Sequence, residues 1–214
     1  MNISKPNKSL FITIEGIDGC GKSTQVAKIQ QFFLQQNIPH LTTKEPGGTD
    51  FGLQIRQILL QTRSSPLLKE TQLLLNFANR IEHINKFILP NINNGINIIC
   101  DRFIDSTYAY QGFGMGIKLD TIDFLTANFI NISPDITFLI DVDIDIAQQR
   151  IKARSQQDYN YYEQLPLTFH QKVKNGFLDL AKQNSRIKII NGNNHPDVVF
   201  AQIITILNKL YEEK

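Results

Sequence analysis

The chain carries GIDGCGKS at residues 16–23, which fits the phosphate-binding pattern GxxxxGKS/T. An apolar run at residues 10–14 precedes this segment, and apolar residues recur at helical spacing from 25 to 36. The segment therefore lies between a predicted buried strand and a predicted helix, where this pattern binds a nucleoside triphosphate. A glycine turn with a surface lysine is the alternative interpretation, and the flanking strand and helix argue against it.

This phosphate loop offers groups for an anion and for a metal ion. Its glycines let the backbone curl so that successive N–H groups face phosphate oxygens. The next helix adds the positive end of its dipole, Lys22 adds a charge for the β- and γ-phosphates, and the Ser23 hydroxyl can bind Mg²⁺. We expect the nucleotide to contact Gly16, Ile17, Asp18, Gly19, Cys20, Gly21, Lys22, Ser23 and Thr24.

Composition favours a single enzyme domain. The 214 residues are 42% hydrophobic and 20% charged, which suits one domain with a substantial core. The net charge is only +2 and basic residues are scattered, so neither nucleic acid nor a membrane is an expected partner. Signal-peptide and membrane-spanning patterns are absent from the sequence, so we expect a soluble cytoplasmic enzyme. Cys20 and Cys100 are expected to be free thiols, and the four separated histidines suggest no metal cage.

Short apolar runs alternate with longer segments of helical periodicity. The runs predict strands near 10–15, 40–43, 96–100, 136–141 and 186–190. Helices are predicted at 22–36, 50–62, 69–93, 103–112, 119–131, 144–154, 167–184 and 196–212, with Pro90 bending or ending the third. This alternation predicts an α/β fold, with a five-stranded parallel sheet flanked by helices on both faces.

Polar residues follow three of the predicted strands. Asp18 follows the first, Glu45 the second and Asp101 the third, and such strand ends gather at one edge of a parallel sheet, where ligands bind. We expect Asp101 to hold Mg²⁺ or its waters, with Asp141 after the fourth strand as the alternative. Arg102 favours Asp101, because an adjacent arginine can hold a second phosphate with its planar donors. A structural ion pair is the other interpretation of Asp101 and Arg102.

Five separated segments resemble one family, the thymidylate kinases, and together they span nearly the whole chain. They are IEGIDGCGKST at 14–24, TKEPGGT at 43–49, FANR at 77–80, DRFIDSTYAYQG at 101–112 and PDITFLIDV at 134–142. The resemblance implies a P-loop kinase fold with a mobile helical lid at about 150–166, in a homodimer. It also implies transfer of the γ-phosphate of ATP to dTMP, giving dTDP and ADP, with Mg²⁺ as cofactor.

The resemblance also implies roles for single residues at the acceptor, dTMP. Asp18 would contact the deoxyribose 3′-hydroxyl, and Arg80 and Gln111 would hydrogen-bond thymine. Tyr110 would exclude a ribose 2′-hydroxyl. Arg56 would bind the dTMP phosphate together with Arg102, and an exposed helical arginine is the alternative interpretation of Arg56. We expect the acceptor site to comprise Asp18, Glu45, Pro46, Arg56, Phe77, Arg80, Arg102, Ser106, Tyr110 and Gln111.

Two departures from the family pattern concern the acceptor site. The family commonly has an aromatic residue four positions before Arg80, but this chain has Asn76 there and Phe77 one position later. One residue along a helix is a large rotation, so base stacking does not follow directly. Lys44 stands where arginine is usual, which keeps a charge but loses a bidentate donor.

A third departure concerns the lid. Some family members place an arginine in the phosphate loop and others supply arginines from the lid; this loop has Gly19 at that place. The lid must then supply the cation, and Arg150 and Arg154 are four apart on one helical face. The family's lid segment, Asp-Arg-aromatic-Glu, corresponds here to residues 158–163, without its arginine. A solvated basic helix end is the alternative interpretation.

The expected mechanism is an in-line transfer between two positioned phosphates. Lys22, Arg102 and Arg150 would neutralise the developing charge, and Asp18 would help to place the acceptor. A kinase of another nucleotide, such as dUMP or dGMP, or of a deoxynucleoside, remains an alternative. A GTPase-type switch is disfavoured, because the sequence has no Asn-Lys-x-Asp segment to read guanine.

Overall fold

The computed structural model describes residues 9–153 and 160–212. Five parallel strands form one sheet in the order β2-β3-β1-β4-β5. They are β1 (Phe11–Glu15), β2 (His40–Lys44), β3 (Asn97–Asp101), β4 (Ile136–Asp141) and β5 (Ile187–Asn191). The predicted α/β fold with a five-stranded parallel sheet is confirmed. Because β1 is central, with β3 and β4 as its neighbours, the loop after β1 lies at the middle of the sheet edge.

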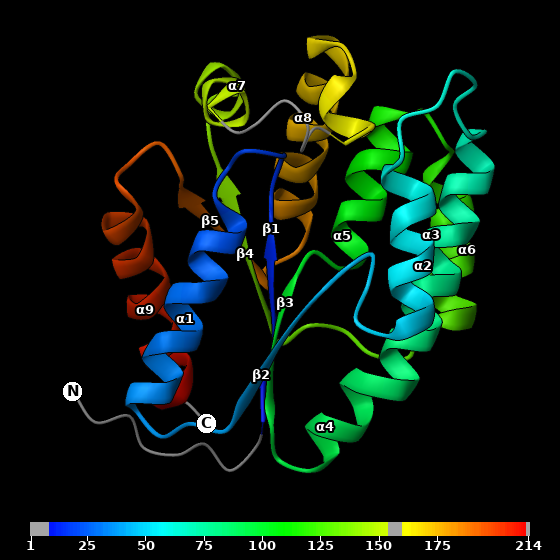
Figure 1. The fold of residues 1–214 in the computed structure, drawn as a ribbon. Helices are drawn as coiled ribbons and strands as arrows, with labels where there is room; N and C mark the ends of the chain where they lie inside the picture. Colours follow the sequence, from blue (N-terminus) through cyan, green and yellow to red (C-terminus); the bar gives the residue numbers. More distant parts are fainter. Residues whose placement is uncertain (1–8, 154–159, 213–214) are drawn as a thin grey trace.

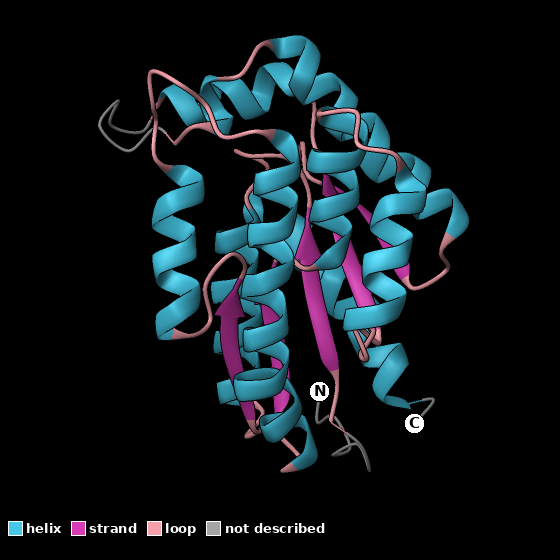
Figure 2. Cartoon of the chain, turned by 90° about the vertical axis from the view of Figure 1, so that its right-hand side faces the viewer, coloured by secondary structure: helices cyan, strands magenta, loops and turns pink. Residues whose placement is uncertain are grey.

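Helices cover both faces of the sheet (Figure 1). One face carries α1 (Lys22–Gln35) and α9 (Pro196–Glu212), and the other carries α4 (Leu89–Asn93), α5 (Ile104–Thr107) and α8 (Leu167–Gln183). Three further helices form an outer group beyond the second face: α2 (Asp50–Leu60), α3 (Lys69–His83) and α6 (Leu119–Phe129). A separate helix, α7 (Ile144–Lys152), lies near the carboxyl ends of the strands. Figure 2 shows the strands side by side behind the helices.

Two predicted helices contain π-helical segments. The first, η1 (Ile84–Ile88), joins α3 to α4, and the second, η2 (Tyr108–Gly114), follows α5. The predicted helix over 69–93 continues to Asn93 as α3, η1 and α4, so of the two predicted effects of Pro90, bending or ending the helix, ending it at Pro90 is wrong. Pro90 is the second residue of α4 and directly follows the π-helical segment η1. A short 3₁₀ helix, η4 (Tyr162–Gln164), precedes α8.

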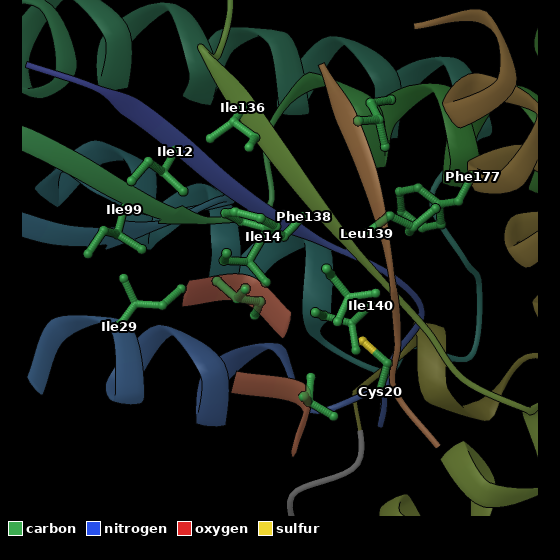
Figure 3. Close-up of a cluster of buried hydrophobic side chains, with 14 of the residues drawn as sticks. Ile12, Ile14, Cys20, Ile29, Ile99, Ile136, Phe138, Leu139, Ile140 and Phe177 are labelled. Carbon is green, nitrogen blue, oxygen red and sulfur yellow. The ribbon is translucent and has the colours of Figure 1, made fainter. Parts of the chain in front are cut away.

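The core forms because both faces of the sheet are apolar. Ile12 and Ile14 of β1 belong to the cluster that includes Ile29 of α1, whereas Phe11 belongs to a second cluster with Phe77. Figure 3 shows Ile29 among the side chains of the first cluster. Burying each such side chain contributes about 1.5–3 kcal/mol, so β1 is held in place by its packing and fixes the start of the loop that follows it. In the described part of the chain, no helix is long and apolar enough to span a membrane.

Candidate active site

The phosphate loop joins β1 to α1 and is packed closely against β4. Gly16 and Gly19 both adopt positive φ, at 141° and 79°. A Cβ atom at Gly16 would lie 2.6 Å from the carbonyl oxygen of Ile140, so a side chain does not fit there. The buried Lys22 donates from Nζ to the carbonyl oxygens of Gly16 and Ile17, at 3.1 and 2.9 Å. Its charge therefore lies within the loop that it follows.

Ser23 and Asp101, the two predicted metal ligands, lie side by side. Because β3 pairs with β1 so that Asp101 is opposite Ile14, the carboxylate reaches the start of α1, and Ser23 Oγ donates to Asp101 Oδ2 at 2.9 Å. Both line a cleft of about 520 Å³ beside the phosphate loop. A hydroxyl and a carboxylate are oxygen ligands that suit Mg²⁺, which keeps several waters and binds substrate phosphates.

The alternative metal ligand, Asp141, lies elsewhere. Its Oδ1 is 3.0 Å from Nζ of Lys174, and it is absent from the lining of the phosphate cleft. Over residues 9–153 and 160–212, three or more His, Cys, Asp or Glu side chains do not gather in a metal-binding group. The geometry therefore favours the pair formed by Ser23 and Asp101, with few protein ligands.

A second cavity adjoins the phosphate cleft. The two spaces share lining residues, so they meet rather than lie apart: Asp18, Glu45, Arg56, Arg102 and Asn160. The second cavity is also lined by Pro46, Leu60, Asn76, Arg80, Phe103, Ser106, Thr107, Tyr110, Gln111 and Tyr162. Two ligands that end at the shared residues would have their reactive groups next to one another, which is what group transfer needs.

Arg102 is held at this junction by four hydrogen bonds. NH1 donates to the Gly16 carbonyl oxygen at 2.8 Å and to Ser106 Oγ at 3.1 Å. NH2 donates to Asp18 Oδ1 at 2.7 Å and to the Tyr110 hydroxyl at 3.1 Å. The backbone φ of Arg102 is 73°, a left-handed conformation that is uncommon outside glycine and is maintained by such a network.

Asp18 is ionised at this junction. Burial raises the pKa of its carboxyl, but the charges of Arg102 and Lys22 lower it more, so the pKa lies below its ordinary value. The Tyr110 hydroxyl also donates to Asp18 Oδ2 at 2.9 Å, and the guanidinium of Arg102 lies 4.9 Å from the centre of the Tyr110 ring. The structure therefore brings together three predicted acceptor residues, and they form a rigid wall.

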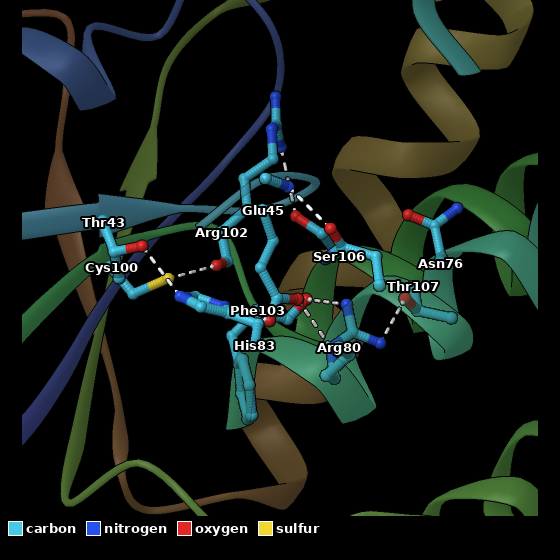
Figure 4. A network of polar contacts seen from close by, with 12 residues as sticks. Thr43, Glu45, Asn76, Arg80, His83, Cys100, Arg102, Phe103, Ser106 and Thr107 are labelled. Carbon is cyan, nitrogen blue, oxygen red and sulfur yellow. Dashed lines mark hydrogen bonds and ion pairs between the residues drawn. The ribbon is translucent and has the colours of Figure 1, made fainter. Parts of the chain in front are cut away.

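A buried polar network forms another wall of the second cavity (Figure 4). Arg80 donates from Nε to Glu45 Oε2 at 2.7 Å, and His83 Nδ1 lies 2.9 Å from Glu45 Oε1. The terminal nitrogens of Arg80 donate to Thr107 Oγ1 at 3.0 Å and to the Phe103 carbonyl oxygen at 3.1 Å. Each terminal nitrogen of Arg80 keeps a second N–H, so this side chain can still donate to a ligand in the cavity.

Arg56 lies where both cavities meet. Thr49 caps the N-terminus of α2 by accepting a hydrogen bond from the Gly52 N–H, and Arg56 follows on that helix. Its NH1 donates to the Pro46 carbonyl oxygen at 3.0 Å. Burial and the nearby charge of Arg102 lower its pKa, and Asp101 and Asp18 oppose this shift. Arg56, which was predicted to bind the acceptor phosphate, therefore lies at the junction of the two cavities.

Phe77 lies outside the second cavity, unlike the other predicted acceptor residues. It is buried in the second core cluster, and its ring centre is 5.7 Å from the guanidinium carbon of Arg80. Asn76 lines the cavity instead, because one residue along a helix turns the side chain by about 100°. Phe77 therefore supports Arg80 from behind rather than facing a ligand.

Arg150, predicted for the lid, reaches the phosphate loop. It donates from NH1 to the Cys20 carbonyl oxygen at 3.3 Å and from NH2 to the Gly192 carbonyl oxygen at 3.1 Å. The other predicted lid arginine, Arg154, belongs to 154–159 and lies outside the described residues. Two residues just after that range, Asn160 and Tyr162, line the second cavity. They are not among the predicted site residues, although Tyr162 provides an aromatic side chain in the predicted lid segment.

Glu15 is a further buried residue that sequence reasoning missed. It accepts hydrogen bonds from the Phe103 N–H at 2.7 Å and from Ser106 Oγ at 2.5 Å. Burial, with a smaller contribution from Asp105, raises the pKa of its carboxyl to about 7, and Arg102 opposes the shift. A single acid within an apolar strand is the signal that could have identified it. Glu15 thereby ties the end of β1 to the segment that carries Arg102.

Comparisons with known proteins identify the family of this chain. The sequence matches the family described as Thymidylate kinase over residues 14–203. Thymidylate kinase of Carboxydothermus hydrogenoformans is 40% identical over 201 residues, which cover 94% of this chain and 97% of that protein. Thymidylate kinase of Wolbachia pipientis is 40% identical over 207 residues, covering 94% and 96%. The crystal structure of thymidylate kinase from Ehrlichia chaffeensis matches with a TM-score of 0.75 and 37% identity, covering 94% of this chain and 99% of that one. The chain therefore belongs to the thymidylate kinase family.

Proposed function

We propose that this protein transfers the γ-phosphate of ATP to dTMP, giving dTDP and ADP for nucleotide biosynthesis. The observation that carries the proposal is the meeting of two cavities at Asp18, Arg56 and Arg102. One cavity is built from the phosphate loop and suits a triphosphate, and the other has a buried polar wall that suits a base. Family membership supports the same pair of substrates.

On the donor side, the chain contributes backbone N–H groups, charge and two oxygen ligands. Lys22 and the N-terminus of α1 attract the β- and γ-phosphates, and Arg150 approaches from α7. Ser23 and Asp101 would hold Mg²⁺, which would supply positive charge to neutralise the phosphates. The phosphoryl group then needs only a positioned acceptor, since the loose transition state requires little covalent help from the protein.

On the acceptor side, Arg56 binds the dTMP phosphate and Arg102 adds its charge beside it. Asp18, ionised between these groups, accepts a hydrogen bond from the deoxyribose 3′-hydroxyl. Tyr110, packed against Arg102, closes the space that a ribose 2′-hydroxyl would need. Arg80 donates to the thymine edge from its remaining N–H groups.

The activity is tested by ADP release from purified protein with MgATP and one acceptor at a time. The acceptors are dTMP, dUMP, dGMP, UMP, AMP and thymidine. We expect strong turnover with dTMP, and dUMP well behind, because one methyl group is worth about 1–3 kcal/mol in a pocket. Stronger turnover with another acceptor, or turnover with none, would refute the dTMP assignment.

We also propose that the protein is a cytoplasmic homodimer with a lid over about 150–166. Exposed apolar side chains on three adjoining helices support a second copy as the occupant of that surface: Phe51 and Ile58 on α2, Leu74 on α3 and Phe124 on α6. Light scattering should give twice the chain mass, and Phe124→Asp should reduce it. A monomeric mass for the unmodified protein would refute the dimer.

A further inference from the structure

We propose that Tyr162 is a positioning residue that turns the Gln111 amide so that its oxygen faces the base, and thereby favours thymine over cytosine. The inference rests on the proposed placement of the acceptor base in the second cavity. Tyr162 comes from η4, just before α8, whereas Gln111 comes from η2, so distant parts of the chain meet here.

A chain of three hydrogen bonds carries the proposal. Gln72 of α3 donates from Nε2 to the Leu67 carbonyl oxygen at 3.0 Å. The Tyr162 hydroxyl donates to Gln72 Oε1 at 2.9 Å, and Gln111 donates from Nε2 to the Tyr162 hydroxyl oxygen at 3.3 Å. The three hydrogen bonds thus all point the same way, with donors and acceptors in the order Gln111, Tyr162, Gln72 and Leu67.

The direction of this chain is set by chemistry at its far end. A backbone carbonyl can only accept, so Gln72 must present its NH₂ group to Leu67 and its oxygen to Tyr162. A hydroxyl has a single proton, and the Tyr162 hydroxyl donates it in the hydrogen bond to Gln72 Oε1. Toward Gln111, the Tyr162 oxygen can therefore only accept. Gln111 must therefore present its NH₂ group to Tyr162, which leaves Oε1 as the group offered to the cavity.

Burial makes this orientation effective. Gln72 is 2% exposed, Gln111 3% and Tyr162 8%, so water does not compete freely for these bonds. Burial, followed by the neighbouring Tyr161, raises the pKa of Tyr162 above its ordinary value, so its hydroxyl keeps the proton that Gln72 accepts. Within the described part of the chain, Gln111 Oε1 has no hydrogen-bond partner and is not sealed from the cavity.

The resulting cavity wall fits one base edge and opposes another. Arg80 donates to Thr107, and Gln111 follows Thr107 by four residues in the same helical segment, so donors and an acceptor line one side. Thymine and uracil present a carbonyl oxygen beside an N–H, which matches Arg80 and the oxygen of Gln111. Cytosine presents an NH₂ group beside an unprotonated nitrogen, which is the reverse at both positions.

Kinetics with dTMP and dCMP test the proposal. We expect Tyr162→Phe to raise KM for dTMP about 3–10-fold, the value of one hydrogen bond, and to change kcat less than twofold. The ratio of kcat/KM for dTMP to that for dCMP should fall by a similar factor. The matched control is Tyr161→Phe, because Tyr161 lines a separate small cavity; this variant should keep the KM for dTMP and the ratio of the two kcat/KM values.

A second variant keeps the test decisive if Tyr162→Phe folds poorly. In Gln72→Leu, the Tyr162 hydroxyl loses its acceptor and can donate to Gln111, so the amide turns and offers NH₂ to the cavity. We expect the dTMP preference to fall further than in Tyr162→Phe. Circular dichroism would verify that each variant is folded.

Gln111→Leu separates this inference from the acceptor-site proposal. If Gln111→Leu loses the preference for dTMP while Tyr162→Phe and Gln72→Leu keep it, the orienting chain is refuted and the acceptor site stands. If Gln111→Leu itself keeps the unmodified KM for dTMP, the base does not bind in this cavity and both proposals fail. Loss of preference in all three variants supports both.

Discussion

Replacing Glu45 with alanine should destabilise the fold, because it leaves a buried charge without its partner. Glu45 is 3% exposed and Arg80 1%, and their closest N–O distance is 2.7 Å. In Glu45→Ala, Arg80 would keep only the neutral acceptors Thr107 Oγ1 and the Phe103 carbonyl oxygen, and His83 would lose its carboxylate. Removing one partner of a buried pair costs about 3–5 kcal/mol. For a domain of this size we expect the Tm to fall by roughly 6–20 °C.

Urea unfolding followed by circular dichroism measures this loss directly. The matched control is Asp179→Ala, which removes an exposed pair with Lys182 and should change the unfolding free energy by about 0–1 kcal/mol. The double variant Glu45→Ala/Arg80→Met also removes the unpaired charge, so we expect it to be more stable than Glu45→Ala alone. If the double variant instead loses the sum of the two single losses, an uncompensated charge is not the cause.

Three further predictions concern the two ligand sites and the strand between them. Arg56→Ala should raise KM for dTMP about 10–100-fold, the value of a charge-assisted hydrogen bond, while Arg63→Ala, on the surface, should not. In a Mg²⁺ titration, Asp101→Asn should raise the concentration that gives half-maximal activity about tenfold or more; an unchanged midpoint would contradict the metal assignment. Glu15 should stabilise the fold most below its unfolded pKa of 4.5 and lose this contribution as the pH rises through about 7. The unfolding free energy relative to Glu15→Gln should therefore decrease between pH 5 and 8.5, and a constant difference would contradict the raised pKa.

The sheet was predictable because its signals are local. Four strands are largely apolar runs, whereas β2 (HLTTK) is mostly polar, and each observed strand lies within one residue of its prediction. The phosphate loop was also predictable, since its glycines adopt positive φ values that other residues rarely adopt. The pairing of Ser23 with Asp101 depends on the position of β3 beside β1, whereas the sequence predicted only that the ends of these strands share one edge of the sheet.

The parts that were missed depend on contacts between distant segments. The π-helical segments η1 and η2 leave no clear periodicity signal, because each changes the helical repeat over only 5 or 7 residues. Phe77 was included in the acceptor site from the family resemblance although it lies one position after the usual aromatic, and the structure places it in the core. Tyr162 and Glu15 act through partners more than 50 residues away, so neither role can be read from neighbouring residues.

Arg102 and Arg56 were both predicted to bind the acceptor phosphate, but they differ in the N–H donors that they can offer to it. The four terminal N–H groups of Arg102 already donate to the Gly16 carbonyl oxygen, Ser106, Asp18 and Tyr110. A phosphate can therefore meet the charge and the Nε–H of Arg102, but it can meet the paired terminal donors only by displacing these partners. Arg56 donates only to the Pro46 carbonyl oxygen among the described residues, so both N–H groups of its NH2 are available. The planar grip on the acceptor phosphate thus falls to Arg56, and Arg102 contributes the fixed charge and the wall against which the two substrates meet.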